Sequence, residues 1–412
     1  MRGTYDVIVI GGGASGTMAA GRAAELGKKV LLLEKNAKLG EKLAISGGGR
    51  CNILNAEENK RTLLAHYGKA EQFLYSPFSQ FSMRDAYSFF ESRGLPLKVE
   101  ARKRAFPQSG KAADVVRVLA HYLKKGGVEV HTKSPVERIV SADGRIEGVC
   151  VHGKTYRADS YILATGGVSH PETGSTGDGF RWLAALEHTV KQPTPTITPL
   201  RASDAWIRKA SGITIKNMKL TFSAEGKRAF SVRGDVLLTH FGISGPLILN
   251  ASSKVADILQ QGAVTGVIDT YPDLDLGILE KKMTALFDTN KNKLLKNVFK
   301  EIAPPGTGLV ILGLVTDVDP DTKVHSVTKG DRRKLAQALK ALPLSITGLM
   351  GFERAVVADG GLVLTEIDTK TMQSLKYPNL YVTGDVLHVM RPSGGYSLQL
   401  AWTTGYVAGS NA

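Results

Sequence analysis

The sequence has little cysteine and no long hydrophobic run. Its two cysteines, Cys51 and Cys150, are too few for a disulfide framework, which favours a reducing compartment or free thiols. No apolar segment approaches the roughly 18 residues of a membrane-spanning helix, and the first apolar run leads straight into glycines rather than into a signal-peptide cleavage site. We therefore expect a soluble, cytoplasmic protein without a membrane span.

Metal-binding patterns and acidic residues are also scarce. No His, Cys, Asp and Glu residues recur at metal-ligand spacing, so we expect no metal site. The 38 Asp and Glu residues are outnumbered by 53 Lys and Arg residues, which gives a net charge of +15. This surplus favours anionic ligands, either a phosphate-rich cofactor or nucleic acid. No long basic block with interleaved aromatics is present, so the pattern itself does not favour nucleic acid. The length of 412 residues suits two or three domains.

The N-terminal segment has the pattern of a dinucleotide-binding strand–helix–strand unit. Val7–Ile10 is a short β-branched run typical of a buried strand. Ala14–Leu26 is Ala-rich and ends before Gly27, a natural helix C-cap. Val30–Leu33 then predicts a second buried strand. The fold class indicated is α/β with a Rossmann-like domain.

Glycines and one acid in this segment indicate the ligand. Gly11, Gly13 and Gly16 have the spacing G-x-G-x-x-G, which permits a tight turn, close backbone approach to a pyrophosphate and close helix–strand packing. The helix N-terminus would face the phosphates. Glu34 ends the second strand, where it accepts hydrogen bonds from ribose hydroxyls and disfavours a 2′-phosphate. The pattern therefore predicts FAD or NAD rather than NADP.

Three later segments repeat this small-residue character, and we expect each to contact the cofactor. The loop Ser46–Asn52 exposes bare glycine backbone, and Arg50 within it suits a phosphate or carboxylate. Tyr161–Gly167 is a strand that runs into a small-residue turn. Leu380–Asp385 is a strand ending in Gly-Asp, and Gly394-Gly395 precede a helical stretch, Leu400–Ala408. That helix would direct its N-terminus at the flavin edge where negative charge develops on reduction.

The middle of the chain has a different texture and no nucleotide motif. We expect a discontinuous cofactor domain over 1–194 and 346–412, a β-rich, barrel-like domain over 195–270 with return strands near 307–330, and a mainly helical insert over 271–345. The expected strands are Met218–Phe222, Val236–Leu238, Leu247–Asn250 and Thr265–Asp269. Within the cofactor domain, residues 56–125 look largely helical, with a basic loop at Lys103–Lys111 that either lines a substrate mouth or is merely solvated.

Together these motifs resemble the BaiN/RdsA-type NAD(P)/FAD-dependent oxidoreductases, relatives of the YhiN flavoproteins within the glutathione-reductase-like group. The stretches LLLEKNAKLGEKLAISGGGRCN and THFGISGPLILN carry the likeness most specifically. The resemblance implies FAD, with contacts at Ser15, Glu34, Lys35, Lys42, Gly48, Arg50, Val136, Asp385 and Leu398. From the glycine turn, the neighbouring loops and the C-terminal segment we add Gly11, Gly13, Gly16, Gly49, Cys51, Asn52, Thr165, Gly166, Gly384, Gly395, Tyr396 and Ser397.

The chain departs from the family pattern close to the expected flavin ring. Val389–Ser393 stands where the family commonly has an acidic, Thr/Gly-rich turn. Ser397 stands where Asn is common. These departures predict that substrate or reactivity differs from that of better-known relatives.

Only one dinucleotide motif is present, so NADH or NADPH would dock transiently as the reductant. The resemblance implies reduction of a C=C bond conjugated to a carbonyl, which needs a proton donor and groups that polarise the carbonyl. Tyr396 is a candidate donor or a packing residue, and Arg391 binds an acidic substrate or lies on the surface. Cys51 is a redox thiol or, more simply, a structural cysteine, because no Cys-x-x-Cys partner exists. His240 and His388 are placed near the flavin or in structural turns.

Three functions stay open on the sequence. The first is an FAD-dependent reductase of a small unsaturated, enone-like molecule. The second is an RNA-modifying flavoprotein, to which the charge of +15 points. The third is a non-catalytic flavin-binding or electron-transfer protein. The sequence gives no oligomeric state.

Overall fold

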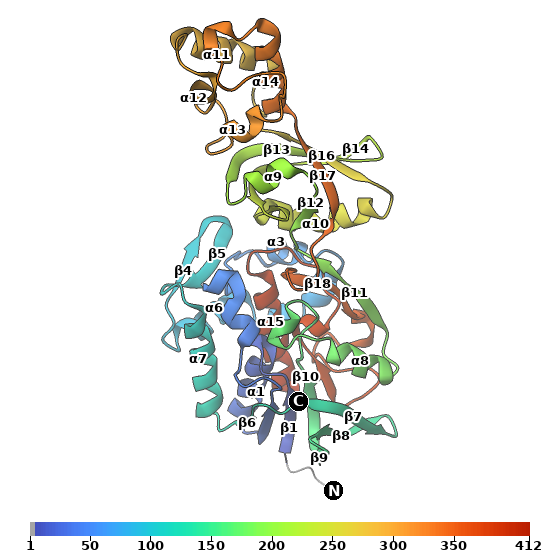
Figure 1. Ribbon diagram of the computed structural model, residues 1–412. Coiled ribbons are helices and arrows are strands. Elements are labelled where there is room, and N and C mark those ends of the chain that lie inside the picture. Colours follow the sequence, from blue (N-terminus) through green and yellow to red (C-terminus); the bar gives the residue numbers. More distant parts are fainter. Residues whose placement is uncertain (1–4) are drawn as a thin grey trace. The chain divides into compact units, whose positions relative to one another are not determined.

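The structure is a computed structural model that describes residues 5–412 (Figure 1). The chain divides into two compact units. The first, called the cofactor unit below, contains the residues up to Pro195 together with Val356–Ala412. The second, called the barrel unit, contains Thr196–Ala355. Within the described residues, no helix combines the length and apolar character that crossing a bilayer requires.

A five-stranded sheet forms the centre of the cofactor unit. Its strand order is β19-β10-β1-β2-β6, and every neighbouring pair is parallel. The strands are β1 (Tyr5–Ile10), β2 (Val30–Leu33), β6 (Glu129–His131), β10 (Ala158–Leu163) and β19 (Leu380–Val382). The central strands are apolar on both faces, as expected for a parallel sheet covered by helices.

Two helices from opposite ends of the chain pack closely in this unit. They are α1 (Ala14–Glu25) and the C-terminal α15 (Tyr396–Asn411). A Cβ atom added at Gly405 would lie 2.4 Å from the Ser15 carbonyl oxygen, and one at Gly409 would lie 2.3 Å from that of Ala19. Glycine is therefore required for the close approach of the two helices. The contact joins the first nucleotide-binding element to the last.

The cofactor unit contains further helices and strands around this sheet. The helices are α2 (Glu41–Ile45), α3 (Lys60–Ala65), α4 (Glu71–Leu74), α5 (Pro77–Gln80), α6 (Met83–Glu91), α7 (Ala112–Lys125) and α8 (Asp178–Ala185). The strands are β3 (Leu54–Asn55), β4 (Leu97–Glu100), β5 (Arg104–Pro107), β7 (Val136–Ala142), β8 (Arg145–Val151), β9 (Lys154–Tyr156), β11 (Val190–Thr196) and β18 (Val357–Leu362).

The basic segment Lys103–Lys111 is only partly a loop. Residues 104–107 form β5, the middle strand of a three-stranded sheet. This strand is held by long-range pairing with β3 and β4, and it buries Ala105 and Phe106. A local sequence pattern does not show which distant strands pair. The expectation that residues 56–125 are largely helical therefore missed this small sheet.

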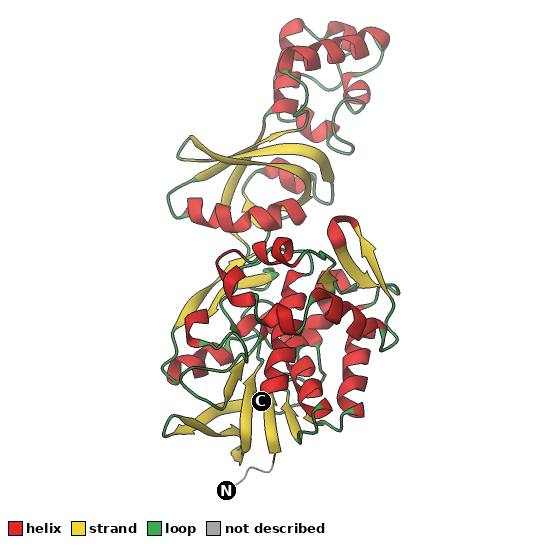
Figure 2. Cartoon of the chain, turned by 180° about the vertical axis from the view of Figure 1, so that it is seen from behind, coloured by secondary structure: helices red, strands yellow, loops and turns green. Residues whose placement is uncertain are grey.

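The barrel unit is built on a closed barrel in the order β12-β15-β14-β13-β16-β17. The strands are β12 (Leu200–Ala202), β13 (Thr214–Ala224), β14 (Lys227–Thr239), β15 (Gly242–Ser244), β16 (Val264–Asp269) and β17 (Leu342–Leu349). Figure 2 shows these strands as a curved yellow sheet, with the helices of residues 271–345 gathered as a separate red group. The expectation of an α/β protein with a Rossmann-like domain and an inserted barrel-like and helical part is confirmed.

Two segments that were expected to form strands are helical instead. Leu247–Asn250 lies in helix α10 (Pro246–Leu259), which begins with proline and buries Ile248, Ala251, Ser252 and Val255 along one face. A short apolar run does not distinguish strand from buried helix. The segment 307–330 contains helix α13 (Gly308–Leu312) and a 3-10 turn at Val324–Ser326 instead of return strands. The strand that closes the barrel is β17, so residues 346–349 belong to the barrel.

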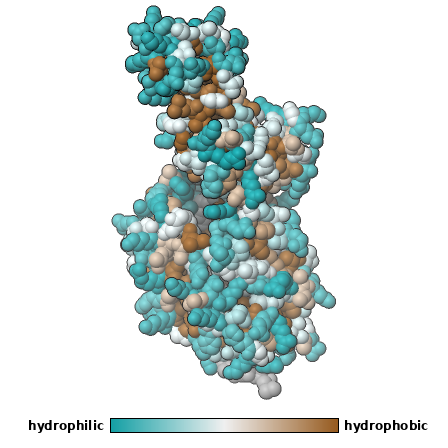
Figure 3. Space-filling model, viewed as in Figure 1, coloured by the Kyte–Doolittle hydropathy of each residue, from teal (hydrophilic) through white to brown (hydrophobic). Residues whose placement is uncertain are grey.

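The helical part of the barrel unit lies between β16 and β17. It contains α11 (Leu276–Thr289), α12 (Leu295–Phe299), α13 and α14 (Lys329–Lys340), and a short helix, α9 (Ala205–Lys209), lies earlier in this unit. A capping box between Thr328 and Asp331 begins α14. Polar residues cover most of the visible surface, whereas brown apolar residues gather on part of the helical segment (Figure 3). Ile278 and Leu309 are exposed apolar side chains in this segment.

Candidate cofactor site and active site

The parallel sheet brings four distant segments to one edge of the cofactor unit. Since the carboxyl ends of parallel strands share an edge, the residues after β1, β2, β10 and β19 emerge together. The Gly11 N–H donates to the Leu33 carbonyl at 2.8 Å, and the Ala164 N–H donates to the Ile10 carbonyl at 2.9 Å. The segments at this edge include those expected to bind cofactor: Gly11–Gly16, Glu34, Thr165–Gly166 and Gly384–Asp385.

The glycine turn has the geometry of a phosphate-binding loop. Gly11 has φ +106°, and a Cβ there would lie 2.5 Å from the Ala164 carbonyl oxygen. A Cβ at Gly16 would lie 1.9 Å from the Gly11 carbonyl oxygen, whereas one at Gly13 would meet nothing within 4 Å. Gly13 is the N-cap of α1, with no side-chain cap and no acid in the first turn. The helix N–H groups at this end are therefore available to an anion.

Backbone donors hold the Glu34 side chain in one orientation. Its buried carboxylate accepts from the Gly12 N–H and from the Asn36 N–H, each at 2.7 Å. Two backbone donors fix the orientation of the carboxylate and leave a lone pair on each oxygen for a hydroxyl. The carbonyl of Glu34 accepts from the Ser134 N–H at 2.9 Å, which brings the start of β7 and Val136 to this region.

Two of the basic residues that we expect to contact the cofactor form ion pairs with acidic residues of the same unit. The Lys35 ammonium pairs with Asp178 at 2.7 Å and donates to Thr176 at 2.5 Å. The Arg50 guanidinium pairs with Glu100 at 2.6 Å. These contacts orient both cations, and their roles toward phosphate stay predictions.

The loop at residues 46–52 presents bare backbone. Gly47, Gly48 and Gly49 all have positive φ, and Cβ atoms at the last two would meet nothing within 4 Å. Asn52, with its amide turned so that its donors and acceptor are all paired, accepts from the Gly395 N–H at 3.0 Å. This bond ties the loop to the start of α15. A Cβ at Gly395 would lie 2.3 Å from the backbone of Leu54, so the position requires glycine.

Cys51 is buried and 0% exposed, and burial raises its pKa to about 12. Because the thiolate is the reactive form, these properties favour a structural cysteine over a redox thiol. We expect native protein at pH 8 to resist iodoacetamide at Cys51, while protein in urea reacts fully. Mass mapping of the labelled peptide measures this, and rapid native labelling of Cys51 would contradict the structural role.

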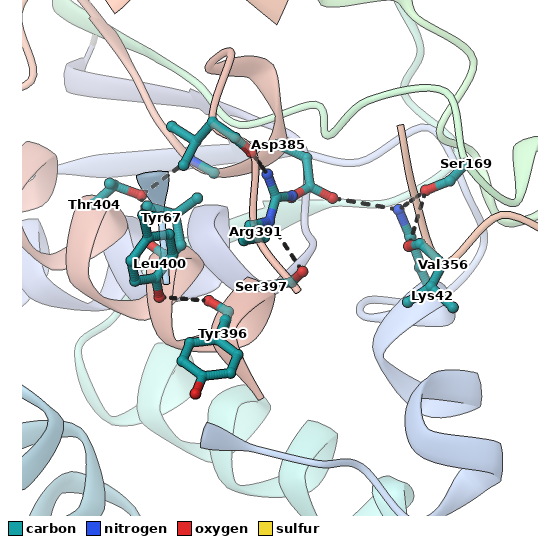
Figure 4. A network of polar contacts seen from close by, with 12 residues as sticks. Lys42, Tyr67, Ser169, Val356, Asp385, Arg391, Tyr396, Ser397, Leu400 and Thr404 are labelled. Atoms are coloured by element: carbon teal, nitrogen blue, oxygen red, sulfur yellow. Dashed lines mark hydrogen bonds and ion pairs between the residues drawn. The ribbon is translucent and has the colours of Figure 1, made fainter. Parts of the chain in front are cut away.

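Asp385 lies at the centre of a polar network (Figure 4). One carboxylate oxygen accepts from the Arg391 guanidinium, and the other accepts from the Lys42 ammonium at 3.4 Å. Lys42 also donates to Ser169 at 2.6 Å, and the Ser169 hydroxyl donates to the Val356 carbonyl at 3.4 Å. Burial acts to raise the pKa of Asp385, but the charges of Arg391 and Lys42 outweigh it and hold that pKa below its usual value.

Gly384 brings the segment after β19 against the first turn of α1. This residue has φ +65°, and a Cβ there would lie 2.6 Å from the Ser15 hydroxyl. Its N–H donates to Thr404 in α15 at 3.0 Å. Ser15, in the first turn of α1, and Asp385 are thus brought together from residues 370 apart in the sequence. Within residues 5–412, the hydroxyl of Thr165 and the amide oxygen of Gln399 are buried without a hydrogen-bond partner, which leaves polar groups for a ligand.

The structure shows what the side chains of two catalytic candidates contact. The Arg391 side chain is 1% exposed and pairs with Asp385, so it lies neither on the surface nor free for an acidic substrate. Tyr396 packs its ring against His66 and Tyr67 at centroid distances of 4.8 and 5.9 Å. In Figure 4 the Tyr396 hydroxyl points away from Asp385 and Arg391. These contacts favour packing for Tyr396.

Two histidines have different surroundings. His240 follows β14 in the barrel unit and contacts Phe241 edge-on at 4.9 Å. His388 lies in the cofactor unit, with Nδ1 3.1 Å from Asp359 and Nε2 3.4 Å from the Lys191 ammonium. Burial lowers the pKa of His388, which favours its neutral form. Sequence reasoning missed Asp359, Lys191 and Ser169, since no local motif marks them.

Residues 5–411 match the family described as the HI0933-like protein Rossmann domain. The chain belongs to this family. It is 30% identical over 98% of its length, and 98% of the relative, to 3-dehydro-bile acid delta(4,6)-reductase of Clostridium scindens. It is 28% identical over 97% of its length, and 96% of the relative, to ribosomal RNA dihydrouridine synthase of Haemophilus influenzae.

Solved structures show the same fold. The 3-ketosteroid-delta4-(5alpha)-dehydrogenase of Rhodococcus jostii aligns with a TM-score of 0.55 at 17% identity, over 99% of this chain and 96% of that one. The expected family and the expectation of an FAD-dependent oxidoreductase are confirmed. The residues that hold FAD, the reductant and the substrate are matters of proposal.

Proposed function

We propose that this protein reduces a C=C bond conjugated to a carbonyl in a small molecule, with FAD as resident cofactor and NAD(P)H as transient reductant. The observation that carries the proposal is the shared edge of the parallel sheet, where the glycine turn, Glu34 and Asp385 meet. When bound, FAD accepts hydride from the nicotinamide and donates it to the substrate. The proposal also covers a cytoplasmic location.

The residues divide the cofactor between two halves of the site. Gly11–Gly16 and the N-terminus of α1 bind the pyrophosphate, and Glu34 binds the adenosine ribose. The bare backbone of Gly48 and Gly49 and the carboxylate of Asp385 serve the flavin half. The N-terminus of α15, with no side-chain cap and no acid in its first turn, supplies positive potential where reduction adds negative charge. The orphaned Thr165 hydroxyl and Gln399 amide oxygen are compatible with ligand contacts there.

The substrate class is supported by the relatives' chemistry. A bile-acid delta(4,6)-reductase acts on a C=C bond of a steroid-type molecule. Uracil also contains a C=C bond next to a carbonyl, so dihydrouridine synthesis adds hydrogen to the same type of bond. A substrate with that bond is common to both relatives.

RNA modification is the second candidate function. The net charge of +15 and the whole-length similarity to a ribosomal RNA dihydrouridine synthase favour it. Binding that depends on phosphate contacts weakens steeply as salt rises. Heparin retention that falls with salt, together with co-purified RNA, would support this candidate.

Anaerobic stopped-flow mixing separates the candidates. The FAD-loaded protein is first mixed with NADH or NADPH, and loss of the visible flavin band reports reduction. The reduced protein is then mixed with a 3-keto-4-ene steroid or with unmodified ribosomal RNA, and return of the band reports the acceptor. We expect return with the steroid and none with RNA. The reverse result favours RNA modification, and no bleaching with either nicotinamide would contradict an NAD(P)H-linked reductase.

A further inference from the structure

We propose that Arg391 is a positioning residue of the cofactor site, which keeps the Asp385 carboxylate ionised and directed so that FAD affinity stays independent of pH across the neutral range. The inference rests on the proposed FAD site. It assigns Arg391 to the cofactor rather than to the substrate.

The hydrogen bonds that the Arg391 guanidinium donates all go to residues of the cofactor unit. Its Nε–H donates to the Ser397 hydroxyl at 3.0 Å, and its terminal N–H groups donate to the Val389 carbonyl and to Asp385. The side chain is 1% exposed. A buried cation of this kind requires a paired anion, and Asp385 is that anion. Arg391 thereby joins the turn after β19 to the first turn of α15 (Figure 4).

The second partner of Asp385 is weaker. The Lys42 ammonium lies 3.4 Å from the other oxygen and is closer to Ser169, at 2.6 Å. The Lys42 side chain is 28% exposed, against 1% for Arg391, so solvent screens its charge more. Arg391 is therefore the main electrostatic support of Asp385. Without it, burial would favour the protonated carboxyl.

Other titratable groups near Arg391 do not supply a replacement cation. His388 lies between Asp385 and Arg391 in sequence, and burial lowers its pKa, so it is mainly neutral near pH 7. His388 itself contacts Asp359 of β18 and Lys191 of β11. Tyr67, packed beneath α15, is buried, and burial raises its pKa, so it stays neutral as well. Removal of Arg391 therefore leaves Lys42 as the cation beside Asp385.

Arg391 lies within Val389–Ser393, the segment that departs from the family pattern, and Ser397 is the second departure. The structure joins the two departures through the 3.0 Å hydrogen bond between their side chains. They form one feature, because the Ser397 hydroxyl accepts from the same guanidinium that holds Asp385.

The test measures the FAD dissociation constant of reconstituted apoprotein by flavin fluorescence from pH 5 to pH 8. For the unaltered protein we expect a value that is constant within about twofold, since Asp385 stays ionised. For Arg391→Met we expect binding weaker by at least about tenfold at pH 7. Its affinity should rise with pH, because the raised pKa of Asp385 makes the carboxylate fraction grow from pH 5 to pH 8.

Three further variants make the result specific. Arg391→Lys keeps the charge and should show a smaller loss and a flatter pH profile, and it carries the test if Arg391→Met does not fold. The double variant Arg391→Met/Asp385→Asn should bind weakly at every pH, with the slope removed. Arg84→Met is the matched control, because Arg84 is an exposed residue paired with Glu58, and it should behave as the unaltered protein.

Two results would overturn the inference. One is a flat pH profile and unchanged affinity in Arg391→Met. The other is a slope that persists in the double variant, which would assign the titration to His388 instead. If the unaltered protein binds no FAD at any pH, the proposed function itself fails. If the unaltered protein binds FAD and Arg391→Met binds it equally well at every pH, only the role of Arg391 fails.

Discussion

Gly13→Val is expected to leave the apoprotein folded and to weaken FAD binding by about 100-fold or more, which is about 2.7 kcal/mol. A Cβ at Gly13 meets no atom within 4 Å, and the residue has φ −81°, so valine fits the protein without strain. The same side chain occupies the space over the N-terminus of α1 that the pyrophosphate backbone contact needs. Folding and cofactor binding are therefore separated by one substitution.

The measurement pairs thermal unfolding of apoprotein with titration of FAD. Gly330→Ala is the control, because Gly330 lies in α14 and a Cβ there is 3.6 Å from its nearest neighbour. It should leave FAD affinity unchanged. A Gly13→Val variant that binds FAD as tightly as the unaltered protein would show that the glycine turn is not part of the cofactor site.

Trp402→Ala is expected to lower the free energy of unfolding of the cofactor unit by about 3–5 kcal/mol. Trp402 is 0% exposed in α15, packs against Phe90 with ring centroids 5.2 Å apart, and donates its indole N–H to the Ile53 carbonyl at 2.8 Å. Truncation leaves both a cavity and an unpaired buried carbonyl. Trp402→Phe, which loses the hydrogen bond but keeps a ring, should cost about 1–3 kcal/mol.

Urea unfolding measures these losses, and FAD titration adds a second readout. Since Ile53 directly follows the loop that we assign to the flavin half, Trp402→Phe should also weaken FAD binding. Trp206→Phe is a matched control, because Trp206 donates to the Pro343 carbonyl at 2.8 Å within the barrel unit. It should leave FAD affinity unchanged. Equal effects of the two substitutions on FAD affinity would contradict the assignment of the site to the cofactor unit.

Local pattern was enough to predict the elements around the glycine turn. Val7–Ile10 and Val30–Leu33 fall within β1 and β2, and Ala14–Leu26 contains α1. Apolar runs, glycine spacing and a C-cap act over a few residues, so the sequence displays them directly. The structure adds that Glu34 and Asp385 share one edge of a parallel sheet, because such a sheet places the carboxyl ends of its strands together.

Long-range pairing was not predictable in the same way. The bond between Arg391 and Asp385 depends on how the turn folds back, and the pairs of Lys35 with Asp178 and Arg50 with Glu100 join distant segments. The helix α10 was missed because a short apolar run fits either a strand or a buried helix. The closing strand β17 is held by long-range pairing with β12 and β16. Tertiary contacts determine whether such a segment forms a strand or a helix.

The most direct test of the account is the visible absorbance spectrum of the purified protein before and after incubation with FAD. We expect a protein-bound flavin spectrum that is present at isolation or formed on reconstitution and is retained after gel filtration. We expect that Gly13→Val does not retain the flavin. Absence of a bound flavin spectrum in the unaltered protein after incubation with excess FAD would contradict the central claim.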